Sequence, residues 1–315
     1  MAWESLLFLI AGLAIVVYGA DEAIKRLLNL SRFLRLSVFA AGILIAGTLA
    51  VLPEMSIGVI SAFEGSSSFG FGIILGSNVA DLTIVLGVVV LFAGGLKLNP
   101  TLLKQLRISF LAVILPVLLL LDGEISTLDG VVLIGAFVVY SVWLVKRGRD
   151  GEKVIQNRGF IRFAIEIALL VVGITVLFIG SSLVTDQAQI LSVSLGLPLF
   201  LIGVIVALGT CLPELAFSVR ACGIKNCDLG LGNILGNVLA DSMLSIGVIA
   251  VIQPIRPSNL FFPLSTGFFM VFSVLLVYWR SKDGVLDKRD AAVLILVYAI
   301  FIAVQASFEA LGVLI

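Results

Sequence analysis

Two pairs of short motifs place carboxylate, amide and hydroxyl groups at matching positions in the two halves of the sequence. Leu-Pro-Glu at 52–54 is followed by Gly-Ser-Asn-Val-Ala-Asp at 76–81. Leu-Pro-Glu recurs at 212–214 and is followed by Gly-Asn-Val-Leu-Ala-Asp at 236–241. Each equivalent residue comes 160 positions later in the second half. Two motifs that share one offset indicate an internal repeat.

The side chains of these motifs suit the binding of a hard cation. Ser77 and Asp81 are four residues apart, so they share one face of a helix. Asn237 and Asp241 have the same spacing. A proline directly before each motif glutamate would break or kink its helix and release backbone carbonyls. Such an all-oxygen set is the kind that Ca2+ takes, with six to eight ligands, and Na+ uses similar oxygens.

The composition excludes most other kinds of chemistry. Of the 315 residues, 60% are hydrophobic and 13% are charged, and the mean hydropathy is +1.22. These values exclude a soluble globular protein. The net charge of zero gives no indication of a nucleic-acid partner, and the lack of histidine removes His-based catalysis and His-ligated zinc. We therefore expect no enzyme and no cofactor, and we interpret Cys222 and Cys227 as ordinary loop thiols.

Hydropathy predicts an all-α integral membrane protein. A helix needs about 20 apolar residues to cross a bilayer. The ten predicted transmembrane spans are 3–20, 36–62, 70–93, 108–121, 129–146, 160–183, 198–221, 230–252, 259–279 and 290–308. The first span has no basic segment before it and no clear cleavage site, so we do not interpret it as a signal peptide.

Basic residues are distributed very unequally between the two sides of this predicted membrane protein. The loops after spans 1, 3, 5, 7 and 9 hold 19 of the 20 lysines and arginines, and only Arg256 lies on the other side. Positively charged loops stay in the cytoplasm. We therefore predict a multi-pass protein of the plasma membrane with both termini outside.

The polar segment 147–159 divides the ten spans into five and five. The first repeat is then 1–146, with its motif region at 47–87, and the second is 160–315, with its motif region at 207–247. Because each half has an odd number of spans, the second half enters the membrane from the opposite side. Inverted repeats of this kind are typical of secondary transporters.

Four acids lie within the predicted spans and belong to the motifs. Insertion of each charged group into a bilayer costs roughly 2.5–3.5 kcal/mol. No lysine or arginine lies deep in a span to neutralise them, so a transported cation or a proton is the simplest counter-charge. We interpret the fifth acid in a span, Glu166, as a structural group that pairs with Arg162 or reaches the interface.

The sequence resembles the calcium:cation antiporter superfamily, and specifically the prokaryotic type of its sodium/calcium exchanger branch. The family carries a Gly-Thr-Ser-x-Pro-Glu/Asp motif followed by a Gly-Ser-Asn-x-x-Asn/Asp motif in each repeat. Residues 209–214 here are Gly-Thr-Cys-Leu-Pro-Glu, and the remaining motifs are those quoted above. The resemblance covers essentially the whole chain.

This resemblance implies a set of ion ligands and a transport mechanism. Glu54 and Glu214 would share a central Ca2+, and Asp81 and Asp241 would complete the middle of the site. The other implied ligands of Ca2+ and of the flanking Na+ ions are side chains or carbonyls at Ser77, Asn237, Thr210, Cys211, Gly47, Ala50 and Ala207. In the family, spans 1 and 6 slide against the other eight spans to alternate access.

The sequence also departs from the family motifs. Residues 49–51 are Leu-Ala-Val in place of Gly-Thr-Ser, Cys211 replaces a serine, and Asp81 stands where these exchangers usually carry asparagine. Four carboxylates around one divalent ion would leave a formal charge of −2. The leading hypothesis is therefore Ca2+ exchange for Na+, and the alternative is H+-coupled exchange of Ca2+ or another divalent cation.

Three other classes of function explain the motifs less well. A channel usually forms its acidic ring from several subunits. An intramembrane aspartyl protease would need a Gly-x-Gly-Asp motif, which this sequence lacks. A structural scaffold leaves the four acids without a role. The transporter hypothesis requires the lipid bilayer and no protein partner, and it leaves the oligomeric state open.

Overall fold

The computed structural model describes residues 2–33, 51–98, 100–147, 160–223 and 227–310, and nearly all of them are helical. The first-half helices are α1 (Ala2–Phe33), α3 (Leu52–Phe63), α4 (Ser67–Ala80), α5 (Leu86–Ala93), α6 (Pro100–Leu119) and α7 (Thr127–Arg147). The second-half helices are α8 (Phe160–Leu195), α9 (Leu199–Thr210), α10 (Leu212–Gly223), α11 (Cys227–Ala240), α12 (Ile246–Ile252), α13 (Phe261–Arg280) and α14 (Lys288–Ala310). Short elements are the π-helices η1 (Asp81–Val85) and η3 (Asp241–Ser245), the 3-10 turns η2 (Leu120–Asp122) and η4 (Ser281–Asp283), and strands β1 (Leu96–Lys97) and β2 (Val285–Leu286).

Eight described helical segments are long and apolar enough to cross a membrane. Two more, Leu52–Phe63 and Thr127–Trp143, are apolar but shorter. Each of the ten predicted spans overlaps one of these segments. The sixth span was predicted too short, because α8 continues to Leu195. Polar residues from Thr185 onward lower the hydropathy there, but helical bonding continues, and the Thr185 hydroxyl donates to the Ser181 carbonyl (2.9 Å).

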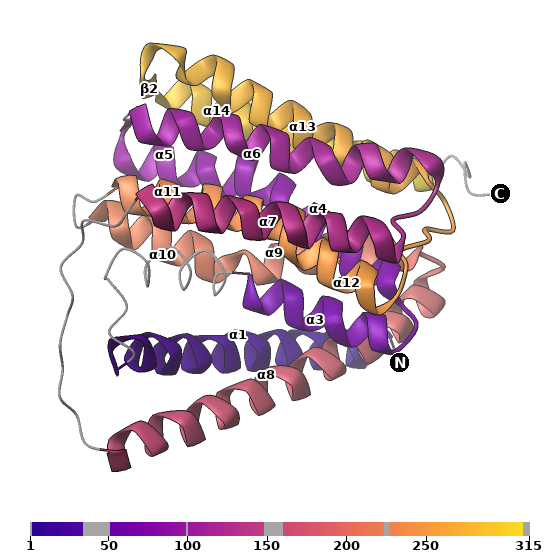
Figure 1. Ribbon diagram of the computed structural model, residues 1–315. Coiled ribbons are helices and arrows are strands. Elements are labelled where there is room, and N and C mark those ends of the chain that lie inside the picture. Colours follow the sequence, from indigo (N-terminus) through magenta and orange to yellow (C-terminus); the bar gives the residue numbers. More distant parts are fainter. Residues whose placement is uncertain (1, 34–50, 99, 148–159, 224–226, 311–315) are drawn as a thin grey trace.

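Helices α1 and α8 pack against each other along their length and lie along one side of the bundle (Figure 1). Glycines on both helices allow this close approach. A Cβ at Gly19 would lie 2.5 Å from the backbone nitrogen of Leu177, and one at Gly180 would lie 2.8 Å from that of Val16. The two helices therefore meet backbone to backbone, a geometry that small residues permit in membranes.

Glu166 on α8 is held by α1. Its carboxylate accepts hydrogen bonds from Asn29 (3.1 Å) and from Arg26 (3.4 Å), and Arg26 also pairs with Glu22 (2.8 Å). The side chain of Arg162, the partner proposed from the sequence, lies outside the described residues. The contact that the structure describes is therefore between two helices, not within one.

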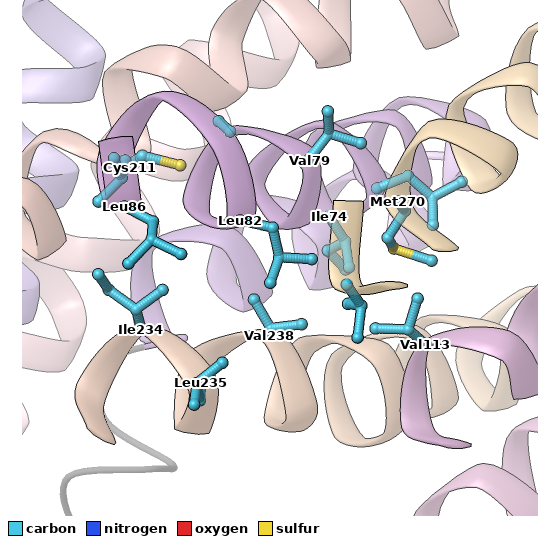
Figure 2. Close-up of a cluster of buried hydrophobic side chains, with 14 of the residues drawn as sticks. Ile74, Val79, Leu82, Leu86, Val113, Cys211, Ile234, Leu235, Val238 and Met270 are labelled. Atoms are coloured by element: carbon cyan, nitrogen blue, oxygen red, sulfur yellow. The ribbon is translucent and has the colours of Figure 1, made fainter. Parts of the chain in front are cut away.

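The centre of the bundle is an apolar core that surrounds the motif helices. Figure 2 shows Leu82 and Leu86 meeting Ile234 and Val238 of α11. Around them, α6 and α13 contribute further buried side chains. This core fixes the spacing between the two segments that carry the motif aspartates.

Two strand-like pairings join loops at opposite ends of the bundle. Strand β1 pairs antiparallel with β2, which joins the α5–α6 and α13–α14 connections. At the other end Ile125 pairs with Ile255, which joins the α6–α7 and α12–α13 connections. Helix α1 begins and α14 ends at the same end of the bundle (Figure 1). Loops that the charge distribution assigns to one side of the membrane are therefore joined to each other.

The interpretation of Cys222 and Cys227 as free loop thiols was wrong. The two residues form a disulfide between the end of α10 and the start of α11. The helices run as a hairpin, which brings the two Cα atoms to 4.2 Å. The spacing alone did not reveal this pairing, because it depends on where one helix ends and the next begins.

Candidate cation-binding site

Both motif glutamates lie in the first turn of a helix that begins just before a proline. Glu54 is in α3 and Glu214 is in α10. Helix α9 ends at Thr210 and α10 begins at Leu212, so the break expected before the second proline is present. The positive end of a helix dipole favours negative charge in this position. Glu54 is fully buried and Glu214 is 4% exposed.

The motif aspartates begin the two π-helices, and each is bonded to a motif residue from the other half of the chain. The Asn237 amide donates to Asp81 (2.7 Å), and the Ser77 hydroxyl donates to Asp241 (3.2 Å). All four side chains are fully buried. The pairing is reciprocal, because Ser77 precedes Asp81 by four residues as Asn237 precedes Asp241. π-Helical turns are rare and occur frequently at functional sites.

Of the remaining predicted ligands, three are described by the structure and two are not. The carbonyl of Ala207 accepts bonds from the Thr210 hydroxyl (3.0 Å) and the Cys211 amide (3.1 Å), so these groups bond within their own helical turn. The Cys211 thiol is buried and faces the Ser77 carbonyl at 3.8 Å. Gly47 and Ala50 lie outside the described residues.

Two further contacts at the site were not singled out from the sequence. The Ser245 hydroxyl donates to Asp241 (2.8 Å), and the Asn78 amide donates to Ser242 (3.1 Å). Ser245 lies four residues after Asp241, so the same spacing rule that linked Ser77 to Asp81 could have identified it. Ser242 had no such signal, because its partner comes from the other half of the chain.

Three of the four motif acids keep unused acceptor atoms in a buried place, whereas both oxygens of Asp241 accept hydrogen bonds. Both carboxylate oxygens of Glu54, one of Asp81 and one of Glu214 have no hydrogen-bond partner in the part of the chain that the structure describes. Among the described ion pairs, none involves these acids. The charges that act on Glu54 are those of Glu214 and Asp241, which are also negative. Buried carboxylates without partners are costly, so the arrangement favours a cation or protons.

The four acids are near enough to repel one another, but their carboxylates do not converge on a single point. Within the described residues, no three acidic or cysteine side chains are close enough together to hold one metal ion. Asp81 and Asp241 instead bond to Asn237 and Ser77. In this conformation the Asn237 amide and the Ser77 hydroxyl therefore hydrogen-bond to the two aspartates.

Comparison with known proteins identifies the family. The model of the sodium/calcium exchanger protein family matches residues 4–146 and 165–307. The chain belongs to the sodium/calcium exchanger family. It is therefore a member of a family of membrane transporters that exchange Na+ and Ca2+, and it is a multi-pass membrane protein.

Curated relatives of this exchanger-family protein cover most of its length. An uncharacterized membrane protein of Methanocaldococcus jannaschii is 25% identical over 94% of this chain and 96% of its own. The putative antiporter CaxA of Alkalimonas amylolytica is 26% identical over 79% of this chain and 81% of its own. The sodium/calcium exchanger MaX1 of Methanosarcina acetivorans is 22% identical over 96% of this chain and 99% of its own.

The fold also matches a solved exchanger structure. The sodium-calcium exchanger NCX_Mj, soaked with Na+ and Sr2+, superimposes with a TM-score of 0.66 and 25% identity. The match covers 96% of this chain and 99% of that chain.

Proposed function

We propose that this protein is a secondary active antiporter that exchanges Ca2+ for Na+ by alternating access. The observation that carries the proposal is the set of four buried carboxylates that lack a basic partner among the described residues, three of which, Glu54, Asp81 and Glu214, retain unpaired oxygens. A bound cation would satisfy those oxygens and offset the repulsion between the acids. Membership of the exchanger family supports Ca2+ and Na+ as the transported ions.

The proposed architecture has ten transmembrane helices arranged as two inverted repeats. The eight long apolar segments and the two shorter ones correspond in order to the ten spans. The two π-helices begin 160 residues apart, as the motifs do. The family model matches the two halves separately, which also supports the division at 147–159.

In the proposed site, Glu54 and Glu214 bind the central Ca2+ through their unpaired oxygens. Asp81 and Asp241 adjust the charge of the site, and Ser77 and Asn237 exchange their present hydrogen bonds for ion contacts when the ions bind. The remaining proposed ligands, which would contribute carbonyl or side-chain groups, are Thr210, Cys211, Ala207, Gly47 and Ala50.

Alternating access would come from movement of α1 and α8 as one unit. These helices pack most extensively on each other and meet the rest of the bundle mainly through α3 and α9. Because α3 carries Glu54 and α9 ends four residues before Glu214, sliding of the pair would expose the site first to one side and then to the other. We place the protein in the plasma membrane with both termini outside, in agreement with the basic loops.

Proton coupling is a second candidate because of the composition of the site. Asp81 is fully buried, bonded to an amide, and stands at a position where the resembled exchangers usually carry asparagine. Cys211 replaces a motif hydroxyl that would suit Na+. A site with more carboxylates and fewer hydroxyls favours exchange against H+ over exchange against Na+.

The decisive experiment is Ca2+ uptake into proteoliposomes of purified protein, driven by a Na+ gradient or, separately, by a pH gradient. Na+-driven uptake that Glu54→Gln or Glu214→Gln abolishes supports the Ca2+/Na+ antiporter. Uptake driven only by the pH gradient supports the alternative. Glu124→Gln is the matched control, because this acid lies on the surface and pairs with Arg256. Absence of Ca2+ uptake under both gradients would refute Ca2+ as the transported ion and leave only H+-coupled exchange of another divalent cation to be tested.

A further inference from the structure

The disulfide between Cys222 and Cys227 joins two helices that both contribute to the proposed ion site. Helix α10 carries Glu214 and α11 carries Asn237. At a rise of 1.5 Å per residue, the disulfide lies about 12 Å along α10 from Glu214 and about 15 Å along α11 from Asn237. A covalent bond between the helix ends therefore limits how far the two ligand-bearing helices can separate.

The equivalent hairpin in the first half has no such bond. The positions 160 residues earlier are Ala62 and Ser67, at the end of α3 and the start of α4. That turn is closed by a hydrogen bond from the Ser66 amide to the Ser61 carbonyl (2.7 Å), and a bond from the Ser67 amide to the side chain of Gln253 (3.0 Å) holds it to the residue that follows α12. The hairpin architecture therefore forms without a disulfide, and the bond in the second half has another role.

A role in stabilising the folded state would be smaller than that of a disulfide between distant residues. The two cysteines are separated by five positions. A disulfide that closes so short a loop removes less entropy from the unfolded chain than one that closes a long loop. The α10–α11 hairpin is already closely packed, since the Ser218 hydroxyl donates to the Gly230 carbonyl (3.2 Å).

The position of the pair favours reversible chemistry. The neighbouring basic residues Arg220 and Lys225 place this end of the hairpin on the predicted cytoplasmic side. Disulfides in that compartment are usually transient and redox-sensing. Cys227 is half-buried, and its neighbours Gly223 and Asp228 are exposed, so a water-soluble reductant can reach it.

We propose that Cys222 and Cys227 form a reversible redox tether that slows ion exchange when it is oxidised and releases the α10–α11 hairpin when a dithiol reduces it. This inference rests on the proposed antiporter function. The thiolate of a dithiol attacks one sulfur of the pair, the S–S bond breaks, and a mixed disulfide forms. The second thiol of the reductant then displaces that cysteine. Two electrons and two protons pass to the protein, which gains two thiols, and the dithiol becomes a disulfide.

The test compares wild-type protein in its oxidised and dithiothreitol-reduced forms in proteoliposomes. We expect Na+-driven Ca2+ uptake to be about fivefold slower in the oxidised form, and the Cys222→Ser/Cys227→Ser variant to match the reduced form in both conditions. This variant also controls for effects of the reductant elsewhere. Equal rates in the two forms of the wild type would overturn the proposal. So would alkylation in native membranes that finds the pair always oxidised or always reduced.

A second measurement separates failure of the tether from failure of the proposed function. Reduction should increase hydrogen–deuterium exchange in α10 and in the first turns of α11, and it should leave the α3–α4 hairpin unchanged. If neither form transports Ca2+, the antiporter proposal fails, and amide exchange alone decides the tether. Unchanged exchange in α10 and α11 would then overturn it.

Discussion

The motif helices and the α1–α8 pair differ in how deeply they are buried. In an apolar window of Ser67–Ala93, 89% of the residues are buried, and the corresponding share in Cys227–Ile252 is 78%. In Trp3–Arg26 and Phe163–Leu195 the shares are 33% and 28%. The segments that carry the two motif aspartates are therefore largely enclosed, whereas most residues in the windows of α1 and α8 are not buried.

The two regions are also held together by different contacts. The enclosed segments are joined by hydrogen bonds such as those of Asn237 with Asp81 and Ser77 with Asp241. The α1–α8 pair is joined by glycine packing and by the Glu166 contacts at one end. A polar network specifies one arrangement, whereas two long helices that pack mainly on each other can shift together. In the proposed mechanism, most of the ion ligands therefore lie in the enclosed region, and the helices that slide lie at its periphery.

Replacement of Asp81 tests the enclosed region and should have the largest effect on transport. Asp81→Ala leaves the buried amide of Asn237 without its acceptor, which costs about 1–3 kcal/mol, and removes one of four negative charges from the site. We expect Ca2+ uptake into proteoliposomes to fall to background. Asp122→Asn, on an exposed loop, is the control and should transport normally.

The milder variant Asp81→Asn bears on the coupling ion. An amide oxygen can still accept the bond from Asn237, so folding should be retained. If Asp81 carries the coupling proton, uptake driven by a pH gradient should be lost while Na+-driven uptake remains. Wild-type uptake by both Asp81→Ala and Asp81→Asn under either gradient would show that the enclosed acids do not bind the transported ions.

Substitution of Gly19 tests the peripheral pair and should have an intermediate effect. In Gly19→Ala the new Cβ would meet the backbone of Leu177, which cannot turn aside as a side chain can. We expect the two helices to separate slightly, with a loss of about 1–3 kcal/mol of stability and a lower Tm in thermal unfolding of the purified protein. Gly135→Ala, where no described atom lies within 4 Å of the new Cβ, is the matched control. Equal Tm values for the two variants would contradict close packing of the α1–α8 pair.

The arrangement of apolar segments was largely accessible from the sequence. Hydropathy located segments that overlap all eight long apolar helices, because a bilayer requires each helix to be apolar over its length. It misjudged the end of α8, since a helix can continue through polar residues beyond the apolar stretch. The π-helices at Asp81 and Asp241 were not predicted, because a single extra residue in a helical turn leaves the hydrophobic pattern almost unchanged.

The candidate site was accessible only in part. The repeated spacing singled out Glu54 and Asp81 and their counterparts in the second half, Glu214 and Asp241, because the two repeats carry the same residue types. The bonds between the halves, such as Asn78 to Ser242, depend on how two helices cross, and one sequence does not encode that crossing in a visible pattern. The partner of Glu166 was missed for the same reason, because Arg26 is 140 residues away in the chain.

The contact between Arg26 and Glu166 should have the smallest effect of the three tests. The Glu166 side chain is 9% exposed, but that of Arg26 is 24% exposed and keeps Glu22 as a second partner. We therefore expect a double-mutant cycle with Arg26→Gln and Glu166→Gln to give a coupling energy in thermal unfolding of about 0.5–1 kcal/mol. Glu22→Gln with Glu166→Gln is the control cycle. It should give less coupling, because Glu22 and Glu166 are both acceptors and each bonds to Arg26 instead of to the other.

A coupling energy of zero for the Arg26 cycle would mean that glycine packing is the contact that holds α1 against α8. A coupling of the expected size would mean that the ion pair fixes the register of the two helices, so that they shift as one unit.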